Sequence, residues 1–455
     1  MAMKSVEELA GKNIPSFPPR AQLVAQVRDF NERSKHVSRS RASWLAGAAC
    51  GGFDLRARPI LSLFAASLIA FAPVQVMAQE ANTESSSVRD RPRDEYDPLG
   101  LRFGGFNLDA TLDVGVTSTD NLRAQEINPI EDLFYAVAPT ARLQSGWSRH
   151  ALVLEGGARF LSHEDTSSED VDTNFLRGTG RIDIGSRSNV SLTAGIAHEV
   201  EPRTNPDAPT SGDPVEYDRT DLAVSASHQF NRLRVTGSFG ARQFEYDNQA
   251  FRDNEQTSIR GRLDAELTPR VGLVLEATTD EREYENNPAL DSDGQTILAG
   301  VSINFTDLVR GEVTAGQFSR DYDSGADVDG TAIAANVEWY VSGLTTVTLD
   351  ARRNAEDVGG TVSQPYTETQ YGARVDHELL RNVILTAGVN SGRREYEVID
   401  REDEFVSADV GVDYFMNRRV ALRARYTFDD VESTGANRYR DFDANAFTVG
   451  LSLRL

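Results

Sequence analysis

The sequence predicts an all-β protein, a single transmembrane antiparallel β-barrel of about 18 strands of the bacterial outer-membrane type. A hairpin of two alternating strands and a tight polar turn recurs at intervals of roughly 40 residues from Gly105 onwards. Short turns alternate with longer acidic loops, which is how such barrels are laid out. The last alternating strand also runs up to the final residue, Leu455.

The N-terminal region predicts export. An apolar run over 60–74 follows Arg56 and Arg58 and leads into small residues that end at Ala78, the pattern of a secretory signal peptide. The run is short for a spanning helix. We therefore expect a signal peptide over 55–78 with cleavage after Ala78; a retained membrane anchor is the alternative.

The flanking segments complete the expected domain organisation. Residues 1–54 are either an extended leader or the result of a translation start placed too early. Residues 79–104 are polar and are expected to form a disordered periplasmic arm. The barrel then covers 105–455.

Composition is compatible with this organisation. The chain has 455 residues, a net charge of -23 and 39% hydrophobic residues, and a barrel can be this polar because only every second strand residue faces lipid. Every lysine and the single cysteine, Cys50, precede Ala78, so the mature chain should hold no disulfide and no cysteine metal site. The acidic balance argues against nucleic acid as a partner.

Strict alternation identifies the strands. From Phe106 to Thr117, apolar residues at even positions alternate with polar or small residues at odd ones. A soluble β-sandwich is the alternative, but its strands are usually shorter and its turns closer together. The expected strands are 105–118, 132–144, 149–162, 173–185, 189–200, 218–230, 233–246, 255–268, 270–284, 294–306, 310–322, 329–341, 344–355, 366–379, 382–396, 402–415, 419–430 and 441–455.

The connections and strand ends suggest an orientation. The longer acidic connections are expected outside the cell, and Glu201–Tyr217 is the candidate for a loop that folds into the lumen. Aromatic residues gather near strand ends, where they would form interfacial girdles or, alternatively, stack on sugars inside the lumen. They include Tyr246, Tyr284, Trp339, Tyr366, Tyr396, Tyr414 and Tyr426.

The predicted inner face carries charges of both signs. Neighbouring arginines and carboxylates could brace the wall of a wet lumen. Alternatively, the arginines could form a track for an anionic polymer, because guanidinium groups match carboxylate and phosphate geometry. The candidate track is Arg159, Arg181, Arg234, Arg242, Arg260, Arg262, Arg352, Arg374, Arg423 and Arg425.

Catalysis finds little support. The mature histidines are scattered, without the spacing of metal ligands. Asp376 and His377 are adjacent, so on a strand their side chains point to opposite faces. We expect no enzyme, no metal site and no cofactor.

The C-terminus resembles the assembly signal of outer-membrane proteins. Thr448, Gly450, Leu453 and Leu455 match its pattern, although Leu455 replaces the usual final aromatic residue. With the signal peptide, the polar arm and hairpins such as Asn231-Arg-Leu-Arg-Val235, the chain resembles the alphaproteobacterial "putative beta-barrel porin" family over about 105–455.

The resemblance implies passage of exopolysaccharide across the outer membrane, because members are often encoded in exopolysaccharide clusters. Expected partners are outer-membrane lipid and lipopolysaccharide and the barrel assembly machinery, with polysaccharide and periplasmic export proteins if the implied function holds. A general diffusion porin for small solutes and a structural or adhesive surface barrel remain the alternatives.

Overall fold

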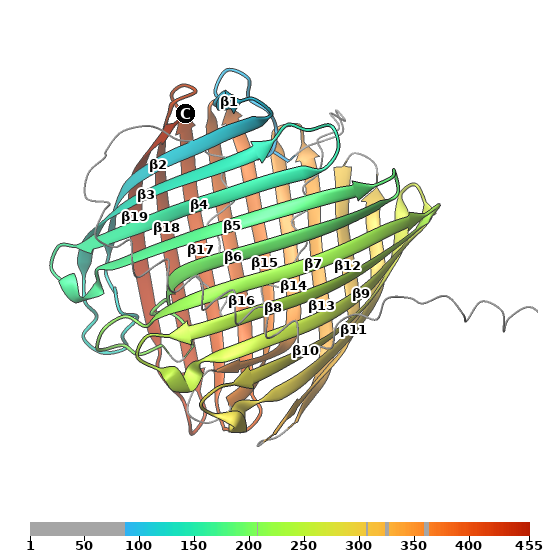
Figure 1. Cartoon of the computed structure of the whole chain (residues 1–455). Coiled ribbons are helices and arrows are strands. Elements are labelled where there is room, and N and C mark those ends of the chain that lie inside the picture. The colour runs from blue at the N-terminus through green and yellow to red at the C-terminus, as the bar shows by residue number, and fades with distance from the viewer. Residues whose placement is uncertain (1–86, 207, 306–307, 324–326, 359–363) are drawn as a thin grey trace, which may run out of the picture. The chain divides into compact units, whose positions relative to one another are not determined.

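The computed structural model describes residues 87–455, apart from 207, 306–307, 324–326 and 359–363. The signal peptide, the cleavage site at Ala78 and the leader lie outside the described residues. Figure 1 shows strands wound side by side around a barrel axis. In the described part of the chain, no helix has the length and apolar character that crossing a membrane requires.

Long antiparallel strands make up almost all of the described chain. They are β1 (Leu101–Phe103), β2 (Phe106–Thr119), β3 (Asp132–Ser145), β4 (Ala151–His163), β5 (Val171–Ile184), β6 (Ser188–Val200), β7 (Glu216–Phe230), β8 (Leu233–Tyr246), β9 (Asn254–Thr268), β10 (Val271–Tyr284), β11 (Ser292–Phe305), β12 (Val309–Tyr322), β13 (Val328–Ser342), β14 (Thr345–Val358), β15 (Gln364–Leu380), β16 (Val383–Tyr396), β17 (Glu402–Phe415), β18 (Val420–Thr434) and β19 (Phe442–Arg454). Single 3₁₀ turns lie in three connections: η1 (Ser167–Glu169), η2 (Ala250–Arg252) and η3 (Pro288–Leu290).

The sheet closes on itself. Each strand from β2 onwards pairs with the next, and β19 pairs with β2 from Ala446↔Thr119 to Arg454↔Thr111. The result is a closed antiparallel barrel of 18 strands. Closure pairs the backbone groups along every strand, so that no sheet edge is left open. A sheet surrounded by lipid requires this, because lipid cannot hydrogen bond to unpaired backbone groups. Both β2 and β19 have their terminal ends at the side where the connections are short.

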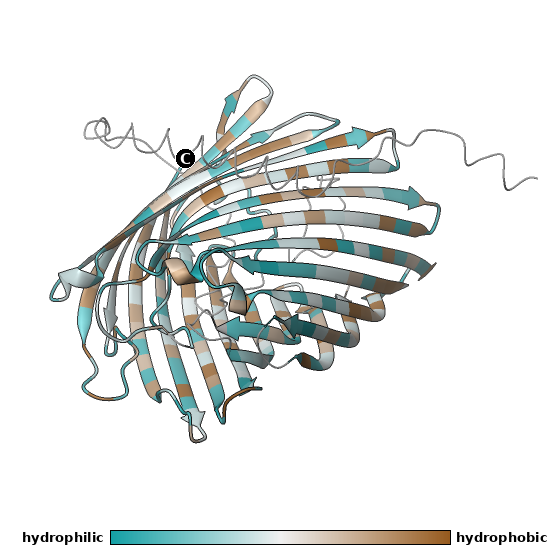
Figure 2. Ribbon diagram, turned by 60° about the horizontal axis from the view of Figure 1, so that its bottom comes forward, coloured by the Kyte–Doolittle hydropathy of each residue, from teal (hydrophilic) through white to brown (hydrophobic). Residues whose placement is uncertain are grey.

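The alternation seen in the sequence sorts side chains between the two faces. On β2, Val114 and Val116 are exposed on the outer surface, and on β19 Val449 and Leu451 continue this apolar band. The residues between them point into the barrel, where Thr117 and Thr448 are hydrogen bonded at 2.9 Å across the closing pair. Figure 2 shows apolar and polar residues alternating along the strands.

The expected strands are confirmed in number and placement. The ranges 233–246 and 402–415 coincide with β8 and β17, and the largest difference is at the end of β18, which continues to Thr434. The sequence did not predict β1, a short strand that folds back on β2 through Gly104. Gly104 has a positive φ of 56°, which glycine adopts at little cost.

The aromatic residues divide between the two faces. Tyr135, Trp339, Tyr414 and Tyr426 are exposed on the outer surface, as a girdle requires. The girdle interpretation is wrong for Tyr246, Tyr284, Tyr366 and Tyr396, which share the inner face with charged neighbours, the location of the alternative. Their rings pack there: those of Tyr366 and Tyr396 lie 5.2 Å apart, and Arg252 stacks on Tyr246 at 4.3 Å.

The described part of the N-terminal arm differs from the expectation of disorder. Residues 87–98, here called the N-terminal segment, form two turns that contact the barrel wall. Val88 is completely buried and Arg93 is 4% exposed. The segment is polar enough for disorder, but buried contacts with distant strands fix its conformation.

Candidate functional site in the barrel lumen

Backbone alternation places all ten arginines of the predicted track on the inner face. Eight of them lie beside carboxylates. These pairs are Arg181–Asp183, Arg242–Asp221, Arg260–Glu276, Arg262–Asp264, Arg352–Glu368, Arg374–Asp376, Arg423–Asp413 and Arg425–Asp409. Arg234 instead donates to Gln229 at 3.0 Å. Arg159 is exposed and has no ionic partner among the described residues.

Arg262 shows what these pairs do mechanically. From β9 it contacts Asp264 at 2.7 Å, Glu276 on β10 at 3.4 Å and Glu312 on β12 at 2.6 Å. One guanidinium group therefore connects three strands, β9, β10 and β12, from inside. The arrangement favours the bracing interpretation of these arginines, and a continuous track of uncompensated cations remains a prediction.

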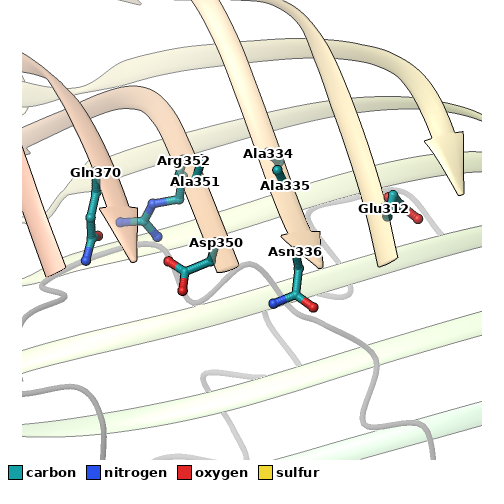
Figure 3. A pocket seen from close by; sticks show the side chains of 8 residues that line it. All are labelled: Glu312, Ala334, Ala335, Asn336, Asp350, Ala351, Arg352 and Gln370. Carbon is teal, nitrogen blue, oxygen red and sulfur yellow. The ribbon is translucent and has the colours of Figure 1, made fainter. Parts of the chain in front are cut away.

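A recess lies in the inner wall beside this brace. It has a volume of about 330 Å³ and opens to the lumen between β12 and β15. Figure 3 shows Asn336, Asp350 and Arg352 around it, with Gln370 and Glu312 at its two sides. These amide, carboxylate and guanidinium groups can donate and accept hydrogen bonds to a polar solute.

A long connection crosses the lumen at the end opposite the short turns. The loop 201–215 joins β6 to β7, yet its backbone is bound by residues beside β17 and β19, at least five strands away around the ring. Because the wall is curved, a segment that joins such distant strands runs as a chord over the opening. This loop is the one expected to fold inward.

Two arginines clamp the crossing loop. Arg440 donates to the carbonyl oxygens of Ala208 at 3.1 Å and Asn205 at 3.2 Å, and also to that of Arg203. Arg401 donates to the carbonyl of Pro206 at 3.1 Å. Ala208 is 2% exposed and Asn205 is 6% exposed, so these parts of the crossing loop are buried against the barrel.

The clamp is itself fixed by buried charge. Arg401 binds both carboxylate oxygens of Asp403, at 2.9 and 2.6 Å, and Asp403 is only 1% exposed. Bidentate pairing of this kind fixes a guanidinium group in orientation as well as position. The ring of Tyr396 lies 4.3 Å below Arg401 and adds a cation–π contact.

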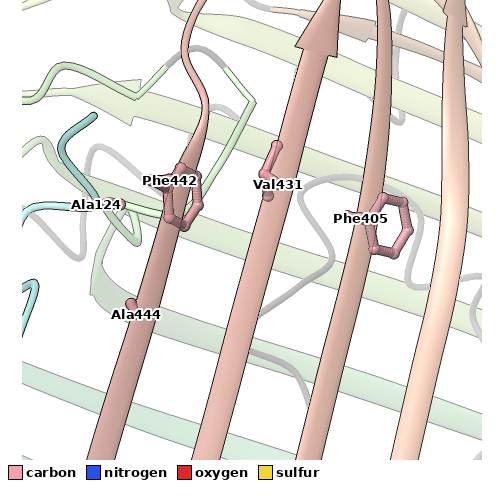
Figure 4. Close-up of a cluster of buried hydrophobic side chains, with 5 residues drawn as sticks. All are labelled: Ala124, Phe405, Val431, Phe442 and Ala444. Atoms are coloured by element: carbon pink, nitrogen blue, oxygen red, sulfur yellow. The ribbon is translucent and has the colours of Figure 1, made fainter.

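Two further loops close in beside the clamp. Ala124, from the loop 120–131, packs against Phe405, Val431, Phe442 and Ala444 on the inner faces of β17–β19, as Figure 4 shows. Glu169 of η1 accepts from Arg123 at 2.8 Å and from Arg203 at 2.7 Å. One buried carboxylate thus joins three loops into a single cover.

Sequence reasoning missed Arg401, Arg440 and Glu169, because charges in acidic loops were interpreted as solvated. A weak signal was present. Arg401 and Asp403, like Arg440 and Phe442, are two residues apart at the start of a strand, so both members of each pair share one face.

The lumen is also narrowed at the short-turn end. Here the N-terminal segment lies against the inner faces of β14–β17, with Arg89 2.7 Å from Asp376 and Arg91 3.3 Å from Glu378. Among the described residues, no group of three or more histidine, cysteine or acidic side chains is placed to hold a metal ion.

A family model matches residues 93–455 of the chain, and its description is "Putative beta-barrel porin 2". The chain belongs to this family. It is therefore an outer-membrane β-barrel porin, and its location is the bacterial outer membrane. In barrels of this type the short turns face the periplasm, so the longer loops, including 201–215, are expected to face the outside.

The chain is similar to several solved structures at low identity. OccK2 (OpdF) of Pseudomonas aeruginosa is 14% identical, with 76% of this chain and 98% of that chain covered and a TM-score of 0.45. OpdL of the same organism is 13% identical, with 78% and 100% covered and a TM-score of 0.42. OccAB3 of Acinetobacter baumannii is 12% identical, with 78% and 100% covered and a TM-score of 0.44. No curated protein sequence matches the chain.

Proposed function

We propose that this porin is a diffusion pore for small hydrophilic solutes. The observation that carries the proposal is the crossing loop 201–215, which the buried Arg401 and Arg440 hold over the extracellular opening. A constriction made of a clamped loop limits the size of what passes, whereas a wide polymer conduit would need an unobstructed opening.

The lining of the pore supports passage of polar molecules without strong charge selection. Paired arginines and carboxylates keep the inner wall wet while most opposite charges lie together. Polar side chains in the recess of Figure 3 can replace part of a solute's hydration shell during passage.

The experiment is solute uptake by liposomes that contain the purified porin. Uptake of neutral sugars and zwitterionic amino acids should fall steeply with solute size. Folded protein, identified by its heat-modifiable migration on a gel, that admits none of these solutes would contradict the proposal.

Passage of exopolysaccharide is the second candidate. The wall recess favours it, because neighbouring amide, carboxylate and guanidinium groups also bind sugar hydroxyls. The test is a clean deletion strain in which polymer is measured at the surface and in the periplasm. Loss outside or accumulation inside would support export; unchanged polymer in both places would eliminate it.

A further inference from the structure

The N-terminal segment is held at the periplasmic mouth by two sets of contacts, one made by its own side chains and one made by side chains of the wall. Its own arginines reach wall carboxylates. Arg89 contacts Asp376 at 2.7 Å and lies 3.9 Å from Asp413, while Arg91 and Arg93 lie 3.3 and 3.8 Å from Glu378. Three cations at alternate positions therefore meet one acidic area on β15 and β17.

Arginines of the wall in turn hold the backbone of the segment. Arg381 donates to the carbonyl of Pro92 at 3.0 Å, Arg418 to that of Asp94 at 3.0 Å and Arg454 to that of Tyr96 at 2.8 Å. The three acceptors are alternate carbonyls. They bind the turns between β15 and β16 and between β17 and β18, and the end of β19, so the segment follows the rim.

The first residues of the segment are buried against the inner wall. Val88 is completely buried, and its N–H donates to the hydroxyl of Thr346 on β14 at 3.0 Å. Arg89 also donates to the hydroxyl of Thr386 on β16 at 2.5 Å. Both threonines are on the inner face and at most 3% exposed. The segment is thus packed inside the mouth.

We propose that the N-terminal segment is a displaceable plug of the periplasmic mouth, and that its release widens the pore and uncovers the carboxylates of Asp376, Glu378 and Asp413. The proposal rests on the proposed pore function. Release would leave Glu378 with Arg381, 3.4 Å away, as its arginine partner among the described residues. The segment carries three arginines and four acidic residues of its own, Asp90, Asp94, Glu95 and Asp97, so its release should change the width of the mouth rather than make it more acidic.

Conductance in planar bilayers tests the plug. A chain that lacks residues 87–98 and the triple variant Arg89→Gln, Arg91→Gln, Arg93→Gln should both conduct more than the full chain. The matched control is Arg102→Gln. Arg102 is exposed and has no partner among the described residues, so this variant loses a cation near the plug without loosening it.

A reversible lock makes the test independent of deletions. In a Cys50→Ser background, Val88→Cys with Thr346→Cys is oxidised to tie the segment to β14, because the Val88 nitrogen lies 3.0 Å from the Thr346 hydroxyl, and loss of free thiols verifies the disulfide. The oxidised pore should keep the low conductance, and reductant should let it rise above that value intermittently.

The outcomes separate this inference from the pore function. Heat-modifiable migration first confirms that each variant is folded. Equal conductance in the full chain, the deletion, the triple variant and the locked pore would overturn the plug while leaving the pore intact. If the folded full chain and the folded deletion both fail to conduct, the pore function itself is wrong.

Discussion

Arg401 satisfies three different groups with one guanidinium: the carboxylate of Asp403, the carbonyl of Pro206 and the ring of Tyr396. A lysine could supply the charge at this site but not the planar pair of donors that Asp403 requires. The residue therefore joins the stability of the wall to the position of the crossing loop, and its removal should affect both.

Replacement of Arg401 by alanine should release the loop 201–215 and increase conductance, with Arg401→Lys intermediate. It should also destabilise the barrel by about 3–5 kcal/mol, because the buried carboxylate of Asp403 loses its cation. Bilayer recordings and the temperature at which the heat-modifiable band disappears measure the two effects.

The control is Arg393→Ala. Arg393 lies on the neighbouring strand β16 but is exposed and pairs with Glu404 at 2.8 Å on the outer surface, where ion pairs contribute little. An unchanged conductance in Arg401→Ala would mean that the loop stays in place without its clamp.

Charge selectivity should depend on the arginines whose charge is not compensated. Arg159 is exposed on the inner face without an ionic partner among the described residues, whereas Arg262 contacts three carboxylates. Arg159→Gln should therefore lower the ratio of anion permeability to cation permeability. Neutralising a braced arginine such as Arg262 should lower this ratio less.

Reversal potentials across a salt gradient provide the measurement for Arg159→Gln and for its matched partner Arg262→Gln. Loss of Arg262 should instead lower the thermal stability of the barrel, because Asp264 and Glu312 would face each other without their shared cation. Equal selectivity shifts in both variants would support the track interpretation over the bracing interpretation.

Three connections between strands are held by the same kind of hydrogen bond. In the loops after β4, β8 and β10, the N–H of the strand's last residue donates to an aspartate seven positions later, at 2.6–2.7 Å. The pairs are His163–Asp170, Tyr246–Asp253 and Tyr284–Asp291. A single 3₁₀ turn, η1, η2 or η3, fills the space between each pair. The hydrogen bond recurs because these hairpins share one loop length.

Replacing Asp291 with alanine should open the loop around η3, because the N–H of Tyr284 loses its acceptor. Asp291→Asn keeps an acceptor oxygen and should open the loop less. Limited proteolysis of intact cells reports the opening, with barrel migration on a gel as the control. If Asp291→Ala is cut no faster than the parent chain, the aspartate does not hold the loop.

The loop after β4 should respond to acid in the same way. The N–H of His163 holds the pKa of the Asp170 carboxyl below its usual value. A carboxylate with a lowered pKa contributes stability above its unfolded pKa and loses it as pH falls through the folded value. The loop should therefore stay closed at neutral pH and open in strong acid.

The strands could be predicted from the sequence because their information is local. Alternation needs only neighbouring residues, and β8 and β17 were bounded to the residue on that basis. The clamp and the plug could not be predicted, because their partners are remote in the chain. Arg401 and Pro206 are 195 residues apart, and Arg89 and Asp376 are 287 apart. No local pattern distinguishes such arginines from solvated ones.

The whole barrel combines a rigid wall with two covers, one at each end. Closure by β19 and β2 fixes the wall, and the assembly signal at Thr448, Gly450, Leu453 and Leu455 remains a prediction. The loop 201–215 narrows the extracellular end, and the N-terminal segment lies in the periplasmic mouth. A solute must pass both, so the two constrictions act as resistances in series.

Series resistance makes a prediction for the double variant. Releasing one constriction leaves the other to limit current, so Arg401→Ala and the deletion of 87–98 should each raise conductance only partly. The increase in conductance of the double variant should exceed the sum of the increases in the two single variants. Single-channel recordings in the same salt provide the comparison, with Arg393→Ala plus Arg102→Gln as the double control. A double variant that conducts no better than the larger single variant would show that the other segment does not restrict the path.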